Sequence, residues 1–259
     1  MSTPQPTIRV VIPARYASMR LPAKPLVDLA GLPMIVRVFQ RVQLGLPGED
    51  ILVATDDERI VQVLARHDIP HVLTAADHQS GTDRAAEVAR LSGWSDDDII
   101  LNVQGDEPLV PCELLRAFAD FCQQQTALQM GTIVVPVTEY QHIHDPNVVK
   151  VVLNQQQDAL LFSRAPIPHC RDISPEQWPL EAFARHIGIY AYRNRVLQQL
   201  ATTPPCALEL REKLEQLRAL WLGIPIRVMA WHESPPHGVD TPADVQRVIR
   251  ILQQQKDTP

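Results

Sequence analysis

The feature that most constrains the fold is a regular alternation of apolar runs and amphipathic stretches over residues 8–124. The apolar runs are short and rich in β-branched residues, which is typical of buried strands. The stretches between them carry apolar residues at helical spacing. We expect strands at 8–12, 51–54, 71–74 and 99–103, alternating with helices at 33–45, around 60–65, at 84–91 and at 111–124. This order predicts βαβ units, and therefore an α/β fold with a mostly parallel sheet between helices.

The second half of the chain is less regular. Strand-like runs follow one another there with little helix between them, at 132–136, 148–153, 160–162 and 187–192. This pattern favours antiparallel or mixed pairing, either at the edge of the sheet or in a small lobe within about 132–192. A length of 259 residues fits one large domain, so we expect residues 1–259 to form a single domain.

Two helices and one strand are expected near the C-terminal end. A helix over about 208–222 would carry an apolar stripe made of Leu210, Leu214, Leu217 and Trp221. A strand follows at 226–230. The last helix begins at Thr241, where Thr241 is the expected N-cap, Pro242 the first helical residue and Asp244 the capping-box partner.

Composition narrows the class of protein. The chain has 24 Lys and Arg against 30 Asp and Glu, a net charge of −6, which argues against a general nucleic-acid surface. No apolar run approaches the ~20 residues of a membrane span, and the first residues do not resemble a signal peptide. The four cysteines form no CxxC pair and are expected to be reduced thiols. These observations favour a soluble cytoplasmic protein that binds neither nucleic acid nor membrane.

The loop after the first strand concentrates positive charge. Arg15, Arg20 and Lys24 fall within ten residues of one another, in a loop that is neither GxGxxG nor a Walker motif. Ligands of open α/β sheets bind at the carboxyl ends of the strands, where this loop emerges. Guanidinium groups bridge phosphate oxygens and an ammonium supplies a mobile charge. The loop therefore predicts a phosphate site, although a solvated basic loop would look the same.

Two acidic segments are candidates for a metal site. Asp106 follows the fourth expected strand, where a carboxylate is well placed to hold Mg²⁺. Spacing alone does not separate Asp106 from its neighbour Glu107 as the ligand. Asp240 lies just before the last helix, and an acidic residue there also stabilises the helix dipole without any further function.

Three further segments carry polar residues with both a structural and a functional reading. The segment 78–84 opens a helix and suits close approach to a base or ribose, or a simple helix cap. His186 falls in a strand-like run, where a hydrogen-bonded core histidine is the usual outcome. Glu215 and Gln216 lie beside the apolar stripe, as boundary side chains also do.

Taken together, these segments closely resemble the CMP-Kdo synthetases, the 3-deoxy-manno-octulosonate (Kdo) cytidylyltransferases. The match covers nearly the whole chain in the family's order. The segments that carry it are VVIPARYASMRLPAKPLVDLAGLPMI, VATDD, ADHQSGTDR, NVQGDEPLVP, DPNVVKVVL, LLFSRAPIP, RHIGIYAYR, LEQLRALWLG and HGVDTPADV. Ala23 replaces the usual glycine of RLPGKP, and Met19 a usual Ser or Thr. A positive φ at Ala23 would cost about 1 kcal/mol or more. The match is weakest over 172–180.

The resemblance implies a Rossmann-like nucleotidyltransferase with a seven-stranded mixed sheet and a small antiparallel dimerisation lobe, working as a homodimer. It implies transfer of CMP from CTP to Kdo for lipopolysaccharide biosynthesis, with Mg²⁺ as cofactor. Catalytic roles are implied for Arg15, Arg20, Lys24 and Asp106, and metal binding for Asp106 and Asp240. The nucleotide would contact Arg15, Arg20, Lys24, Ser80, Gly81, Thr82, Arg84 and Gln104. The sugar would contact Gln104, Arg164, His186, Tyr190, Glu215 and Gln216.

Three alternatives stay open at the level of the sequence. A CMP-sialate synthetase shares the chemistry and the opening arginine–lysine loop. An 8-amino-Kdo cytidylyltransferase would differ only in the sugar pocket. A catalytically silent nucleotide-binding protein is the third, and the presence of both aspartates and all three cations speaks against it.

Overall fold

The alternation of strand and helix in the first half is confirmed. The computed structural model describes residues 6–17, 21–78 and 80–256. The strands are β1 (Ile8–Ala14), β2 (Asp50–Thr55), β3 (His71–Leu73) and β4 (Ile99–Asn102). The helices between and after them are α1 (Met34–Gly45), α2 (Glu58–Arg66), α3 (Gly81–Leu91) and α4 (Cys112–Gln124). β1 pairs in parallel with both β2 and β4, and β2 with β3, as βαβ units require.

The second half completes a mixed sheet. Its strands are β5 (Met130–Pro136), β6 (Lys150–Leu153), β7 (Ala159–Ser163), β8 (Ala184–Arg193) and β9 (Ile226–Ala230). Its helices are α5 (Tyr140–His144), α6 (Asn194–Thr202), α7 (Ala207–Glu212), α8 (Gln216–Trp221) and α9 (Pro242–Lys256). The main path of the sheet is β3-β2-β1-β4-β8-β5-β9. Only the long strand β8 runs antiparallel to its neighbours on this path, so the sheet is mostly parallel.

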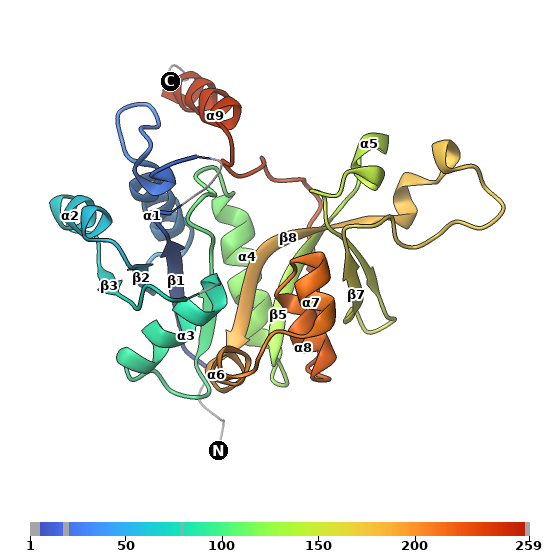
Figure 1. Ribbon diagram of the computed structural model, residues 1–259, viewed down its shortest axis with the longest axis horizontal. Helices are drawn as coiled ribbons and strands as arrows, with labels where there is room; N and C mark the ends of the chain where they lie inside the picture. The colour runs from blue at the N-terminus through green and yellow to red at the C-terminus, as the bar shows by residue number, and fades with distance from the viewer. Residues whose placement is uncertain (1–5, 18–20, 79, 257–259) are drawn as a thin grey trace.

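Helices cover both faces of this sheet (Figure 1). Neighbouring side chains of β1 point to opposite faces, and its residues accordingly divide between two buried clusters. One cluster lies under α1 and α4, and the other under α3, α6 and α8. Together these clusters hold the carboxyl ends of β1 and β4 in place, where the loops with the candidate residues begin.

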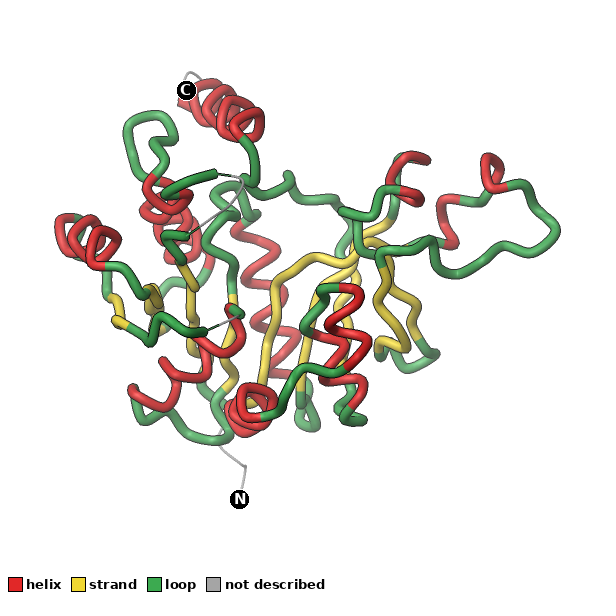
Figure 2. Tube along the Cα trace, viewed as in Figure 1, coloured by secondary structure: helices red, strands yellow, loops and turns green. Residues whose placement is uncertain are grey.

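The β6–β7 hairpin forms the expected antiparallel side structure. β6 pairs with β7 and, through Lys150 and Val151, with the first residues of β8. The chain between β7 and β8 then extends away from the sheet and contains two short 3-10 turns, Pro175–Gln177 and Leu180–Ala182 (Figure 2). A small separate cluster around Trp178 and Phe183 packs the base of this extension.

The prediction of one helix over 208–222 is wrong. The chain breaks between α7 and α8, where Lys213 has a left-handed φ of 53°. Arg218 and Glu209 form a buried ion pair across the break, with Nη2 2.5 Å from Oε1. In one straight helix these residues would lie about 13 Å apart along the axis, so the pair requires the break. Leu210 and Trp221 of the expected stripe are consequently exposed.

The start of α9 is as predicted. Thr241 Oγ1 accepts a hydrogen bond from the backbone N–H of Asp244, and Asp244 Oδ2 accepts one from the backbone N–H of Thr241. This reciprocal pair is a capping box. None of the described helices is long and apolar enough to cross a membrane.

Candidate functional site

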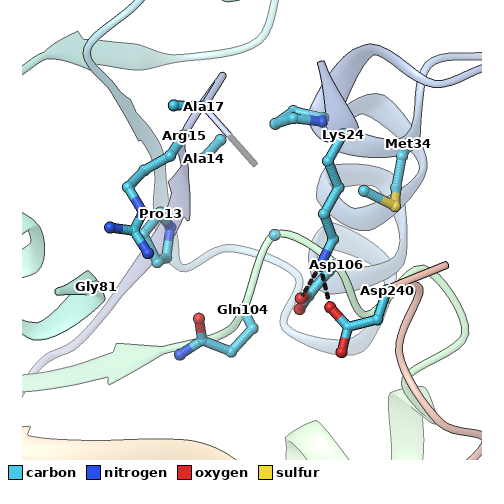
Figure 3. A pocket seen from close by; sticks show the side chains of 12 residues that line it. Pro13, Ala14, Arg15, Ala17, Lys24, Met34, Gly81, Gln104, Asp106 and Asp240 are labelled. Atoms are coloured by element: carbon cyan, nitrogen blue, oxygen red, sulfur yellow. Dashed lines mark hydrogen bonds and ion pairs between the residues drawn. The ribbon is translucent and has the colours of Figure 1, made fainter. Parts of the chain in front are cut away.

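A cavity of about 450 Å³ opens at the carboxyl ends of β1 and β4. It lies where ligands of open α/β sheets usually bind. Six separate segments of the chain contribute to its wall, shown in Figure 3. The lining residues are Pro13, Ala14, Arg15, Ala17, Lys24, Pro25, Met34, Gly81, Gln104, Gly105, Asp106 and Asp240. The cavity therefore brings together both aspartates and two of the three cations that the sequence analysis selected.

Lys24 joins the two aspartates. Its Nζ lies 2.5 Å from Oδ2 of Asp106 and 2.9 Å from Oδ1 of Asp240, as the dashed lines in Figure 3 show. Burial lowers the pKa of Lys24, but the two carboxylates outweigh it and hold this pKa above its usual value. The ammonium is thus fully charged at neutral pH, and it keeps two carboxylates close together that would otherwise repel each other.

Two glycines let the acidic segments approach closely. A Cβ on Gly105 would lie 2.5 Å from the backbone oxygen of Pro13, so only glycine fits where this loop crosses the end of β1. A Cβ on Gly238 would lie 2.9 Å from Glu107 Oε1. Next to Gly238, the backbone N–H of Val239 donates to the carbonyl of Asp106 at 2.9 Å. These close approaches place Asp240 beside Asp106.

The side chains of Asp106 and Glu107 line different cavities. Asp106 lines the main cavity, whereas Glu107 lines a different cavity of about 60 Å³ together with Arg185. Burial, and to a lesser extent the charge of Asp106, raises the pKa of Glu107 to about 8. A carboxyl group that is largely protonated at neutral pH is a poor metal ligand, so Asp106 is the better candidate.

The cationic loop is described in part. Arg15 is exposed and lines the cavity across from Lys24 (Figure 3). Arg20, which is expected to contact phosphate, and Met19, which departs from the family pattern, lie outside the described residues. Ala23 adopts the left-handed conformation, with φ 53° and ψ 32°, directly before Lys24. This is the conformation that the usual glycine would adopt without steric cost.

Ala23→Gly is therefore expected to stabilise the protein by about 0.5–1 kcal/mol. The relief of the left-handed strain exceeds the extra entropy that glycine gives the unfolded chain. Urea unfolding of the wild type and the variant measures this difference. Gly188→Ala is the control for the opposite exchange, since φ at Gly188 is not positive and an added Cβ would meet nothing within 4 Å. An unfolding free energy lowered by Ala23→Gly would contradict the prediction.

The loop that opens α3 contributes mainly through one residue. Gly81 lines the cavity, while Ser80 caps the helix by accepting a hydrogen bond from the backbone N–H of Asp83 at 3.0 Å. Arg84 does not line the cavity: its side chain is fully buried, and its Nη2 bonds Asp56 Oδ2 at 2.7 Å. The structure thus gives Ser80 and Arg84 a supporting place behind the loop, where the sequence suggested direct contact with the nucleotide.

One of the expected sugar-side residues lines the cavity, and some of the others contact one another. Gln104 lines the cavity itself. The ring centroids of His186 and Tyr190 on β8 lie 5.3 Å apart, and Thr82 Oγ1 donates to Glu215 Oε2 at 2.9 Å. Burial raises the pKa of Glu215. None of these last four residues lines the 450 Å³ cavity: His186 lines the cavity of about 60 Å³, and Thr82 and Glu215 line another of about 10 Å³.

Gln216 and Arg164 complete this side. Gln216 is buried, and its Nε2 makes no hydrogen bond with any of the described residues. Arg164 donates from Nε to the carbonyl of Glu212 and from Nη1 to the carbonyl of Pro146, each at 2.7 Å. Neither residue lines the 450 Å³ cavity.

Two buried polar residues that bond these groups were not predicted from the sequence. Lys150 is fully buried at the start of β6, and its ammonium donates to the carbonyls of Asp145, Val148 and Arg164. Thr132 is fully buried on β5 and contacts His186. Both interrupt apolar runs, VVKVV and GTIVV, and a lone polar residue in such a run is the signal that would have found them.

Comparisons with known proteins agree along the chain. A model of the family described as Cytidylyltransferase matches residues 9–226. The 3-deoxy-manno-octulosonate cytidylyltransferase 2 of Paraburkholderia phytofirmans is 58% identical over 247 residues, covering 95% of this chain and 94% of that protein. The 3-deoxy-manno-octulosonate cytidylyltransferase of Thioalkalivibrio sulfidiphilus is 48% identical over 248 residues, covering 95% and 99%. The solved structure of CMP:2-keto-3-deoxy-manno-octonic acid synthetase complexed with CTP aligns with a TM-score of 0.87 at 39% identity, over 96% of this chain and 99% of that one.

Proposed function

This chain belongs to the cytidylyltransferase family, and we propose that it transfers CMP from CTP to Kdo, for lipopolysaccharide biosynthesis. The observation that carries the proposal is that relatives named for this activity match nearly the full chain, while Arg15, Lys24, Gln104, Asp106 and Asp240 line one cavity. In the reaction the anomeric oxygen of Kdo attacks the α-phosphorus of CTP. A new P–O bond forms, the bond to pyrophosphate breaks, and the anomeric hydroxyl loses its proton.

Catalysis of this kind depends on positioning and on charge stabilisation. Arg15 and Lys24 face the cavity and are placed to bind the triphosphate. Their charges stabilise the negative charge that collects on the departing pyrophosphate. Gly81 lets the start of α3 pack closely against the end of β1, because an added Cβ would lie 3.2 Å from the Pro13 side chain.

The residues present also fit a magnesium ion. Asp106 and Asp240 each approach the same Lys24 ammonium within 3 Å, so their oxygens converge on one position for a cation. No cluster of three or more His, Cys, Asp or Glu within residues 6–17, 21–78 and 80–256 is arranged to hold a metal. Two carboxylates completed by substrate phosphates and water is the arrangement that Mg²⁺ prefers. Magnesium held there would lower the pKa of the attacking hydroxyl and offset phosphate charge.

Lys150 is placed to position Arg164, the residue expected to contact the sugar acid. Its ammonium bonds the carbonyl of Arg164 at 2.8 Å and the carbonyls of Asp145 and Val148, on either side of Pro146. Pro146 in turn accepts from the Arg164 guanidinium. Lys150 thus holds both the backbone of Arg164 and the turn that orients its side chain.

Lys150→Met is expected to raise the KM for Kdo about ten-fold or more and to leave the KM for CTP within two-fold. It should also lower the free energy of unfolding by about 1–3 kcal/mol, because buried carbonyls lose their donor. Steady-state kinetics and urea unfolding measure both effects. Arg193→Met is the matched control, since Arg193 also donates to three carbonyls, at the other end of β8. An equal rise of the KM for Kdo in both variants would contradict the positioning role.

The test of the function is pyrophosphate release with a panel of sugar acids. We expect turnover with CTP and Kdo, and much less with sialic acid or with UTP. A preference for sialic acid or for 8-amino-Kdo would replace the proposed substrate. Nucleotide binding in calorimetry without turnover of any sugar acid would instead indicate a catalytically silent protein.

The assembly and the compartment are part of the same proposal. We expect a cytoplasmic homodimer in which residues of about 132–192 form the contact. The exposed Leu160 and Leu161 of β7 and Ile173 of the neighbouring extension are apolar side chains within that segment. Light scattering of the purified protein tests the dimer, and a monomer at working concentration would contradict it.

A further inference from the structure

A β-bulge on β8 lies between two of the expected sugar-side residues. Thr132 of β5 pairs with Tyr190, whereas the next residue, Ile133, pairs with Ile187. Residues 188 and 189 are therefore extra residues on β8. In a regular strand the Cα atoms of His186 and Tyr190 would lie about 13 Å apart. Across the bulge their ring centroids lie only 5.3 Å apart. Bulges of this kind commonly redirect side chains beside functional sites.

The hydroxyl of Thr132 lies inside this bulge. Thr132 Oγ1 lies 2.9 Å from the carbonyl oxygen of Ile189 and 3.2 Å from that of Ile187. It also lies 2.9 Å from Nε2 of His186. Thr132 itself is fully buried, so these contacts replace any hydration of the hydroxyl.

Hydrogen-bond chemistry then determines the protonation of the ring. A threonine hydroxyl has one hydrogen, and backbone carbonyls only accept. If that hydrogen pointed to His186, the Oγ1 lone pairs would face two carbonyl oxygens within 3.2 Å, which is repulsive, so Oγ1 donates to a carbonyl. Towards His186 the hydroxyl must therefore accept, which requires a hydrogen on Nε2. Burial and the charge of Arg185 lower the pKa of His186 to about 3, so the ring is neutral at neutral pH. A neutral ring with its hydrogen on Nε2 has a lone pair on Nδ1.

We propose that Thr132 is a positioning residue that fixes His186 as a hydrogen-bond acceptor at Nδ1, so that this ring receives a hydroxyl group of the sugar acid and not its carboxylate. A carboxylate has no hydrogen to donate, and a lone pair facing it would be repulsive. Phe162 and Tyr190 pack on the ring at centroid distances of 5.0 and 5.3 Å and hold its orientation. The inference rests on the proposed function for the identity of the sugar acid, but not for the tautomer.

Nitrogen-15 NMR of the full-length protein tests the tautomer directly. We expect the two-bond ¹H–¹⁵N pattern of His186 to show hydrogen on Nε2 and an unprotonated Nδ1. His71 is an internal reference for the opposite case, because its Nδ1 lies 2.8 Å from the carbonyl of Ile69 and must carry a hydrogen. In Thr132→Val the pattern of His186 should change to a mixture of tautomers. A wild-type ring protonated on Nδ1 would overturn the proposal without any variant.

Addition of Kdo to the labelled protein tests the ligand chemistry. We expect Nδ1 of His186 to shift but to stay unprotonated, as it does when it accepts from a hydroxyl. Protonation of Nδ1 in the complex would mean that the ring binds the carboxylate, and would overturn the proposal. A protein that does not turn over Kdo at all would instead refute the proposed function, which separates the two failures.

Kinetics add a readout that a purely structural role would not move. Thr132→Val should raise the KM for Kdo about ten-fold or more while the KM for CTP stays within two-fold. Thr132→Ser should restore most of the loss, because serine keeps the hydroxyl. Thr202→Val is the control for loss of a threonine hydroxyl that bonds backbone carbonyls, since Thr202 lies on α6 away from the ring. A KM for Kdo that is unchanged in Thr132→Val would also overturn the proposal.

Discussion

Asp106→Asn is expected to lower kcat by about 10²–10³-fold or more while the protein keeps its fold. The amide removes one of the two negative charges that converge on Lys24, and with it one of the two carboxylate ligands that the cavity offers a divalent cation. The fold should survive because the Asp106 side chain is one-third exposed and Lys24 keeps Asp240 as a partner at 2.9 Å. Pyrophosphate release at saturating CTP and Kdo, with circular dichroism for folding, measures both parts of this prediction.

Glu107→Gln is the matched control for Asp106→Asn. It removes a carboxyl from the neighbouring position, but that carboxyl lines the other cavity and has a raised pKa. We expect its kcat to stay within a few-fold of the wild type. If Glu107→Gln lost activity and Asp106→Asn kept it, the assignment of the metal ligand to Asp106 would be wrong. Asp240→Asn should behave like Asp106→Asn, because both carboxylates approach the same ammonium.

Lys24→Met is expected to change two properties in opposite directions. Turnover should fall by about 10²–10³-fold, because the cation that stabilises the triphosphate and the leaving pyrophosphate is lost. Affinity for a divalent ion in the absence of nucleotide should rise about ten-fold, because the ammonium that neutralises Asp106 and Asp240 no longer competes for their oxygens. A residue that merely stabilised the loop would not produce this combination.

The divalent-ion part of this prediction uses Mn²⁺ as a spectroscopic substitute for Mg²⁺. Electron paramagnetic resonance of free Mn²⁺ titrated with wild type, Lys24→Met and Asp106→Asn gives the three affinities. We expect the order Lys24→Met, then wild type, then Asp106→Asn, from tightest to weakest. Weaker Mn²⁺ binding by Lys24→Met than by wild type would show that Lys24 organises the carboxylates for the metal instead of competing with it. Lys24→Arg keeps the charge and is expected to recover only part of the activity.

The two proposals on the sugar side share one physical idea. Lys150 and Thr132 are fully buried polar residues that do not line the 450 Å³ cavity, yet each bonds a residue expected to contact the sugar acid. A buried donor is costly unless all of its hydrogens find partners, so such residues persist where they hold other groups in place. Substrate recognition in this protein would then depend on the strands β5 and β6 as well as on the residues that meet the ligand.

The fold was predictable because its signals are local. Apolar runs of four or five residues indicate strands, helical spacing indicates helices, and a capping box such as that of Thr241 and Asp244 indicates where a helix begins. The failure at 208–222 has a physical cause that no local pattern contains. The apolar spacing continued through the break, while the pairing of Glu209 with Arg218 and the left-handed Lys213 ended the helix.

The sequence predicted which residues lie at the candidate site better than it predicted what each of them does there. Strand ends and the family resemblance selected Lys24, Asp106 and Asp240. They gave Arg84 a direct contact with the nucleotide, but in the structure it forms a buried ion pair with Asp56. The type of a charged residue and its place in a loop do not reveal whether its side chain points into the cavity or behind it.

By itself the sequence determined the class of fold and the edge of the sheet where the candidate residues gather, since periodicity and caps are properties of neighbouring residues. Only the tertiary structure decided that Lys24 meets Asp240 across 216 positions, that Asp106 faces the cavity and Glu107 does not, and that Thr132 bonds His186. The reason is that contacts between distant segments depend on how whole strands and helices pack, and a change of one residue in register reverses which side chains meet.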